Sequence, residues 1–241
     1  MKMEEIKLSK EQAVSQPVEK NIIVLGFVAF FGGLSQDMIV PILPLFYSQI
    51  LGLPKGTIGI IEGSVTTIIS LLKIISGILS DRLGKRKSMV FLGYLLSAIG
   101  RILLSVTDGA IMTFGLRSID GIGKGIKDAL RDALIAKSSQ KNKTGFAFGF
   151  QRMLDTLGSF VSPIITTGLM IVLIRLPQFS IYRIIFFIAG LMAFITIFII
   201  GFYVKENVSN KICANFRFDF SLLKGKFFGF LYYGFNFYTW E

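Results

Sequence analysis

Charged side chains recur inside long apolar stretches of this 241-residue chain, where they could hold a charged solute, carry protons or form ion pairs. An ionised group at mid-membrane costs at least about 2.5 kcal/mol on insertion scales, so such groups are usually paired, hydrated and functional. Ion pairs that only fix helix packing are the structural alternative. The acids are Asp37, Glu62, Asp120, Asp128, Asp132 and Asp155, and the bases are Lys73, Arg101, Arg117, Lys124, Lys127, Arg131 and Arg152.

The fourth apolar stretch carries the densest set of these charges. At about 100° per residue, Arg117, Lys124, Asp128 and Arg131 share a narrow helical stripe, and Asp120 lies at its margin. Opposite charges recur there at i,i+3 and i,i+4, so much of their cost can be offset within one helix. Three glycines of this stretch would let another backbone approach closely: Gly121, Gly123 and Gly125.

Other stretches carry fewer charges. Glu62 and Lys73 share a face but lie roughly 16 Å apart along a helix axis, too far to pair directly. Arg152 and Asp155 can pair at i,i+3. For Arg101, Arg131 and Asp132, which lie near predicted segment ends, the structural alternative is favoured, because their side chains can reach the membrane interface or pair there.

Six apolar segments must position these groups. The chain is 52% hydrophobic and only 17% charged, whereas soluble domains average about 25% charged. The segments lack alternating polarity and approach the ~20 residues of a membrane span, which predicts helices rather than a barrel. The fold class is therefore all-α and polytopic, with six transmembrane helices at about 21–51, 56–80, 88–107, 110–136, 145–174 and 184–204.

The distribution of lysine and arginine predicts the topology. Outside the predicted spans, one set of connections holds only Lys55, Arg175 and Arg183, while the other set and both polar tails hold sixteen lysines and arginines. The positive-inside rule therefore places the N-terminus in the cytoplasm, in a plasma-membrane protein. The predicted parts are a cytoplasmic tail over 1–20, six helices over 21–204, a cytoplasmic linker over 205–226, and an incomplete seventh span over 227–241, for which an interfacial aromatic segment is the alternative.

Charged faces on helices one, two, four and five, with largely apolar helices three and six, indicate two three-helix repeats around a polar cavity. Transporters that alternate access around a midplane site often have such repeats. With no histidine and only Cys213, the chain cannot build a His/Cys zinc site, a Cys-His nucleophile or an intrachain disulfide. We therefore expect no metal, no cofactor and no enzyme activity, although a membrane-embedded acid–base enzyme is a rival hypothesis. The excess of lysine and arginine over aspartate and glutamate is explained by the membrane topology, so we expect no nucleic-acid partner.

The turn after the second apolar segment reads Gly77-Ile-Leu-Ser-Asp81-Arg82-Leu-Gly84-Lys85-Arg86-Lys87. It resembles the GxLaDrxGrkR loop of the major facilitator superfamily. An ordinary positive-inside loop explains its cations but not the two glycines and the aspartate at these spacings. The resemblance implies a gating turn made by Gly77, Asp81, Arg82, Gly84, Arg86 and Lys87.

Further stretches are similar to other patterns of this superfamily. Arg117 with Gly121 and Gly123 resembles the RxxxGxG pattern of the fourth span, often associated with proton coupling. Asp37, followed by two prolines, looks like the acidic first span. The stretch from Gly158 to Pro163 is similar to the GxxxGP element of drug/proton antiporters, but a serine replaces its second glycine, which argues against antiport. The amino-acid sequences of spans four and five resemble those of a poorly characterised branch of prokaryotic permeases.

The resemblance covers residues 21–204, the N-terminal half of a twelve-span transporter. It implies a proton-coupled secondary permease that moves a small solute by alternating access, with membrane lipid and a separate C-terminal half as partners. The rival is a non-transporting truncated or split-gene product that needs that half. Candidate proton-coupling residues are Asp37, Glu62 and Asp120; candidate anchors for an anionic or zwitterionic substrate are Arg117, Lys124 and Arg152; candidate structural ion pairs involve Asp128, Arg131 and Asp155.

Overall fold

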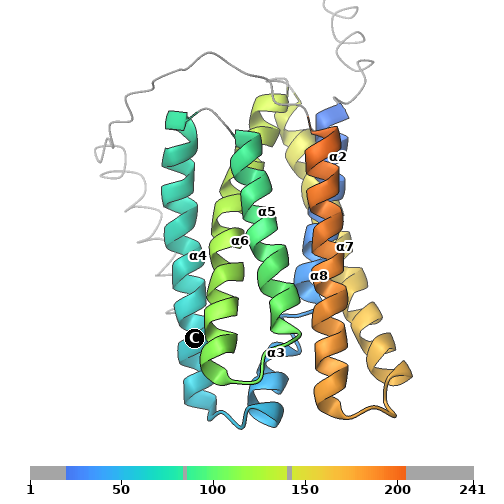
Figure 1. Cartoon of the computed structure of the whole chain (residues 1–241). Coiled ribbons are helices and arrows are strands. Elements are labelled where there is room, and N and C mark those ends of the chain that lie inside the picture. Colours follow the sequence, from blue (N-terminus) through green and yellow to red (C-terminus); the bar gives the residue numbers. More distant parts are fainter. Residues whose placement is uncertain (1–19, 84–85, 140–142, 205–241) are drawn as a thin grey trace, which may run out of the picture. The chain divides into compact units, whose positions relative to one another are not determined.

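The computed structural model describes residues 20–83, 86–139 and 143–204, with side chains over the same ranges except 79–83. All regular elements in these ranges are helical, and the long ones run side by side as a bundle (Figure 1). The long helices are α2 (Lys20–Asp37), α4 (Lys55–Leu83), α5 (Arg86–Leu104), α6 (Ala110–Ser138), α7 (Thr144–Val172) and α8 (Gln178–Tyr203); the short ones are α3 (Leu43–Leu45) and the π-helix η1 (Phe46–Ile50).

The sequence prediction of one uninterrupted span over 21–51 is wrong. Helix α2 ends at Asp37, and turns, α3 and η1 complete the segment. Pro41 and Pro44 explain the break, because a proline lacks the backbone N–H and disfavours a helical residue before it. Helix α8 begins at Gln178 rather than near 184, directly after Pro177, which suits the start of a helix.

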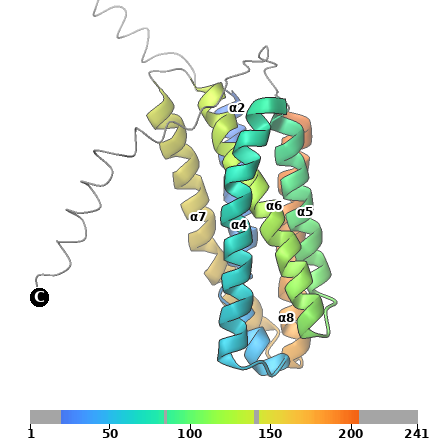
Figure 2. The ribbon, with the colours of Figure 1, turned by 90° about the vertical axis from the view of Figure 1, so that its left-hand side faces the viewer.

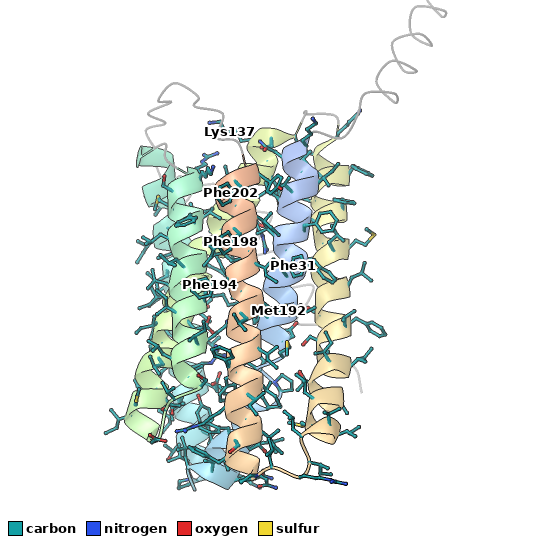
Figure 3. The ribbon with its side chains drawn as sticks, turned by 45° about the vertical axis from the view of Figure 1, so that its right-hand side comes forward. Phe31, Lys137, Met192, Phe194, Phe198 and Phe202 are labelled. Carbon is teal, nitrogen blue, oxygen red and sulfur yellow. The ribbon has the colours of Figure 1, made fainter. Side chains whose placement is uncertain are left out.

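Four of these helices are long and apolar enough to cross a membrane by length and composition: α4 over Lys55–Ile78, α5, α7 and α8. Helices α2 and α6 fall outside this group, and the many charged residues of α6 account for its absence. Outward-facing rings support a lipid environment for α8, where Phe198 and Phe202 stack one turn apart and are 63% and 80% exposed (Figure 3).

The helix contacts follow a regular pattern. Helix α4 packs on α6, and α7 packs on α2; helix α5 packs on α6, and α8 packs on α2. Exchanging the triplet α2–α4–α5 with the triplet α6–α7–α8 leaves this pattern unchanged. Helices α5 and α8 also contact each other, and 44% of the residues in each of their apolar windows are buried, against 11% in α4 and 17% in α7. Figure 2 shows α7 standing apart from α4, with α6 passing behind α4.

Close helix contacts depend on glycines, as the sequence predicted. A Cβ on Gly123 would lie 2.5 Å from the backbone oxygen of Gly93 and 2.7 Å from the Ser97 Oγ in α5. A Cβ on Gly125 would lie 2.7 Å from the Leu72 Cβ in α4. The glycine pattern of α6 therefore admits α5 on one side and α4 on another, which brings charged faces of several helices together.

Several sequence predictions fall on residues that the structure does not describe. These are the tail before Lys20, the linker over 205–226 and the seventh span over 227–241. In the gating turn, Gly84 lies outside the described residues, and so do the side chains of Asp81 and Arg82.

Candidate functional site

A buried carboxylate between two arginines forms the first charged cluster of the bundle. Arg101, 1% exposed, donates from Nε to the Asp120 Oδ1 at 3.0 Å and from Nη1 to the Ser35 Oγ at 2.6 Å. The other Asp120 oxygen accepts from the Arg117 Nη1 at 2.7 Å, which confirms the predicted i,i+3 pair. Because both oxygens of Asp120 face a guanidinium, its charge is compensated where water has no access.

The same cluster continues from α6 to α4 and η1. Arg117 donates from Nη2 to the Glu62 Oε2 at 3.3 Å and from Nε to Oε1 at 3.4 Å. The Tyr47 hydroxyl donates to the Glu62 Oε1 at 3.2 Å. We call Ser35, Tyr47, Glu62, Arg101, Arg117 and Asp120 the buried ion network. It joins five elements of the bundle, and its two arginines face two carboxylates.

For Arg101 and Arg131 the sequence favours a structural role, as ion pairs or at the membrane interface, and the structure shows both side chains in charge contacts inside the bundle. Arg101 turns inward to Asp120, and Arg131 is only 7% exposed, 3.7 Å from the Asp132 carboxylate and 3.5 Å from the Tyr94 hydroxyl. Position near a segment end permits snorkelling but does not enforce it, because a carboxylate or hydroxyl on a neighbouring helix offers the guanidinium a partner inside the bundle.

A second charged cluster surrounds a cavity of about 260 Å³. Helices α2, α4, α6 and α7 line it, as the sequence predicted for helices one, two, four and five, and α5 adds one tyrosine. We call this space the charged cavity. Its lining residues are Gly32, Gly33, Gln36, Asp37, Lys73, Tyr94, Lys124, Lys127, Asp128, Arg131, Arg152, Asp155 and Ser159.

Cations outnumber carboxylates in the lining by five to three. Two of the carboxylates are engaged: Asp128 lies 3.2 Å from the Lys73 Nζ, and Asp155 lies 3.4 Å from the Arg152 Nη1. Asp37 makes no ion pair within the described part of the chain. The cavity therefore has more positive charge than its own side chains balance.

Two lysines of α6 carry much of this surplus. Neither Lys124 nor Lys127 forms an ion pair with a described residue. Lys127 is only 3% exposed, and its Nζ lies 4.6 Å from the centre of the Tyr94 ring. A cation over an aromatic face gains about 0.5 to 2 kcal/mol, which is less than a carboxylate partner would supply.

The structure brings some predicted site residues together and leaves others apart. The charged cavity contains Asp37, Lys124, Asp128, Arg131, Arg152 and Asp155. Arg117, Glu62 and Asp120 lie instead in the buried ion network. Sequence reasoning identified Lys127 as one of the embedded bases but gave it no role, and it did not name Tyr94. The position of Lys127 was available, because it lies three residues after Lys124 and four before Arg131, whereas nothing in the sequence marks Tyr94.

The described residues suit solute binding better than metal binding. Within the described ranges, no group of three or more His, Cys, Asp or Glu side chains is placed to hold a metal ion. The acids are spread over different helices and mostly face cations. Paired and unpaired charges around a small cavity suit the binding of a charged or polar solute.

The family model described as Major Facilitator Superfamily matches residues 25–239. The chain belongs to this superfamily. An uncharacterised MFS-type transporter of Methanocaldococcus jannaschii is 35% identical over 214 residues, which cover 88% of this chain and 52% of the relative. Multidrug resistance protein MdtG of Proteus mirabilis is 29% identical, over 86% of this chain and 51% of its own length. This superfamily member thus spans about half the length of the curated relatives it matches.

Solved structures show the same fold. A peptide transporter POT superposes with a TM-score of 0.69 at 20% identity, over 80% of this chain and 40% of the transporter. The human organic anion transporter MFSD10 superposes with a TM-score of 0.61 at 19% identity, over 79% of this chain and 49% of that protein. The predicted family resemblance is confirmed: this is a multi-pass helical membrane protein of the superfamily, and its relatives are transporters rather than enzymes.

Proposed function

We propose that this chain is the N-terminal half of a proton-coupled secondary transporter that moves a small solute by alternating access. The observation that carries the proposal is the charged cavity, in which cations and acids from α2, α4, α6 and α7 meet. Hydrocarbon cannot accommodate so many ionised groups, so water or a solute must occupy this space during the transport cycle.

The proposed architecture has six membrane spans arranged as two triplets. The exchange symmetry of the helix contacts supports two repeats of three helices. Most charges of α6 lie in the buried ion network and the charged cavity, which keeps them from lipid and supports a membrane-crossing α6, whereas Asp132 and Lys137 lie outside both regions. The lysine and arginine distribution supports a cytoplasmic N-terminus and the plasma membrane as the location.

A second six-helix half is the proposed partner, and lipid covers the remaining surface. Helices α4 and α7 bury little of their apolar stretches, although both line the charged cavity. Arg152 and Lys73 on these helices have side chains 76% and 44% exposed. Charges exposed beside apolar helix faces need an opposing protein surface or water, and the relatives are about twice as long as this chain.

The gating turn is proposed to hold helix ends together during the cycle. Its described cations already reach neighbouring helices: Arg86 donates to the Ala133 carbonyl in α6 at 3.3 Å, and Lys87 donates to the Gly201 carbonyl in α8 at 3.0 Å. Lys and Arg side chains interact favourably with carbonyls at helix C-termini. These contacts support a link between the start of α5, in the first triplet, and two helices of the second triplet, α6 and α8.

The proton-coupling role is proposed for Asp37, Glu62 and Asp120. Asp37 faces the charged cavity without an ion pair to a described residue, so a proton can reach it from the solute pathway. Glu62 pairs with Arg117 of the buried ion network, and its own side chain is 32% exposed, so it connects the network to the outside. The contacts of Arg117 support a role in this network, and they leave Lys124 and Arg152 as the predicted anchors that line the cavity.

Water access to the cavity tests the proposal. In a Cys213→Ser background, Ser159→Cys places a thiol in the cavity lining, and Leu157→Cys places a matched thiol on the exposed apolar side of the same helix. A charged, water-soluble thiol reagent should modify the first variant rapidly in membranes and leave the second largely unmodified. Failure to modify Ser159→Cys under native conditions would remove the basis of the proposal.

A further inference from the structure

We propose that the charged cavity binds a small dianion and that Lys127, together with Lys124, is its anchor. The inference rests on the proposed function and sharpens it by naming the charge class of the solute. It keeps the predicted anchor Lys124 and replaces Arg117, whose guanidinium faces Glu62 and Asp120, with Lys127, which has no ion pair with a described residue.

Lys127 is buried, and the described side chains offer its amino group an aromatic ring but no ion pair. Its side chain lies against the Tyr94 ring, and its residue exposure is 3%. Burying an unpaired ammonium costs far more than a cation–aromatic contact returns. A lysine kept in this position suits a site where a ligand brings the negative charge.

The charged groups around Lys127 explain why no side chain neutralises it. Of the surrounding acids, Asp128 pairs with Lys73, Asp155 pairs with Arg152, and Asp120 lies between two arginines. This leaves Asp37 as the unpaired lining acid. The titratable and charged groups that line the cavity or act on Lys127 are Asp37 on α2, Lys73 on α4, Tyr94 and Arg101 on α5, Asp120, Lys124, Asp128 and Arg131 on α6, and Arg152 and Asp155 on α7.

The charge balance selects a dianion. Five cations and three carboxylates line the cavity, so the lining exceeds neutrality by two positive charges. A dianion such as sulfate, a phosphate ester or a short dicarboxylate would bring the occupied cavity to neutrality. A cationic solute would add to the surplus, and a neutral solute would leave it in place.

The spacing on α6 suits a ligand held at more than one point. Lys124 and Lys127 lie one turn apart at i,i+3, and Arg131 follows Lys127 at i,i+4. Side chains at these spacings emerge roughly 5 to 6 Å apart on one helix face, which lets two of them grasp the oxygens of one anion. A rigid helix also positions such groups more precisely than a loop does.

Binding of sulfate to the purified full chain tests the inference. Isothermal titration calorimetry at constant ionic strength should show saturable sulfate binding, with acetate at least tenfold weaker and glycerol without effect. Lys127→Met should weaken sulfate binding at least tenfold, and Lys124→Met severalfold. The matched control is Lys137→Met on the same helix, close to one end of the bundle and outside the cavity lining (Figure 3), and it should stay within twofold of the parent.

Further variants separate lost binding from lost folding. Lys127→Arg keeps the positive charge and should retain sulfate binding within about fivefold. If Lys127→Met does not fold, the contrast between Lys124→Met and Lys137→Met decides the outcome. Equal affinity for sulfate and acetate, or unchanged sulfate affinity in both cavity variants, would overturn the inference.

The labelling of Ser159→Cys distinguishes this failure from failure of the proposed function. A hydrated cavity that binds no dianion would refute the anion site while the transport proposal stands. A cavity closed to the thiol reagent would refute both.

Discussion

The buried ion network and the charged cavity lie in the same helix bundle, but their charges are compensated differently. In the network, both oxygens of Asp120 face arginines, and Glu62 accepts from Arg117 and Tyr47. In the cavity, five cations face three carboxylates, and Lys124 and Lys127 have no ion pair with a described residue. Helix α6 contributes to both regions. Its charges in the network are paired with opposite charges, whereas its lysines in the cavity exceed the available carboxylates.

This contrast separates charge that holds helices together from charge that is left for a ligand. A matched cluster is destabilised when one member is removed, because the remaining partner stays buried and unpaired. A surplus cation has the opposite property, because its removal relieves an uncompensated charge. The sign of a mutation's effect on stability therefore reports which region a residue belongs to.

The largest effect is expected for Asp120→Asn. The variant keeps the shape of the side chain but leaves Arg101 and Arg117 without their shared counter-charge. We expect the free energy of unfolding to fall by about 3 to 5 kcal/mol, measured by SDS unfolding with circular dichroism. Asp132→Asn is the control, because its side chain is 53% exposed and its loss should stay below about 1 kcal/mol. Equal losses in the two variants would show that the network is not the matched cluster described here.

A smaller loss is expected for Gly123→Ala, at the α5–α6 contact between the two regions. The added methyl would lie 2.5 Å from the Gly93 backbone oxygen and 2.7 Å from the Ser97 Oγ, so α5 must move away. We expect a loss of about 1 to 3 kcal/mol in the same unfolding measurement. Gly115→Ala on the same helix meets nothing within 4 Å and should be neutral or slightly stabilising. A neutral Gly123→Ala would contradict the close approach of the two backbones.

Some contacts within one helix could be predicted from the sequence, because helical periodicity fixes which residues can face each other. The pairs Arg117–Asp120 and Arg152–Asp155 were found in this way, and so was the set of helices around the cavity. The same periodicity also allowed pairs of Lys124 with Asp120 and Asp128, but the structure pairs Asp120 with arginines and Asp128 with Lys73 instead. Apolar run lengths placed most helices to within a few residues. Hydrophobicity alone does not predict the break after Asp37, because the apolar run continues through Pro41 and Pro44.

Contacts between helices could not be predicted from one sequence. Arg101 meets Asp120, and Lys73 meets Asp128, across helix interfaces whose rotation and depth depend on the packing of the whole bundle. The division into a matched network and a surplus cavity follows from these pairings. This is why Arg117 was chosen as a substrate anchor on the sequence alone, while Lys127 received no role.

Lys127→Met is expected to change stability in the direction opposite to Asp120→Asn. In buffer without multivalent anions, the variant removes a buried cation whose described partner is an aromatic ring. The gain should be about 1 kcal/mol, because the lost cation–aromatic contact offsets part of the relief. SDS unfolding checks the sign, and added sulfate should stabilise the parent chain while leaving the variant unchanged. A loss of several kcal/mol would place Lys127 among the matched charges.

The smallest effect on stability is expected for Arg152→Gln, and it gives the finest test of the contrast. Its side chain is 76% exposed, and exposed ion pairs contribute roughly 0 to 1 kcal/mol, so losing the 3.4 Å contact with Asp155 should cost less than about 0.5 kcal/mol. Sulfate affinity should nevertheless fall severalfold, because the variant removes one cation from the cavity lining and frees Asp155 to repel the ligand. Unfolding and calorimetry on the same preparation separate the two effects. A residue that contributes to binding and hardly to stability belongs to the surplus, whereas parallel losses would show that Arg152 and Asp155 are a structural pair.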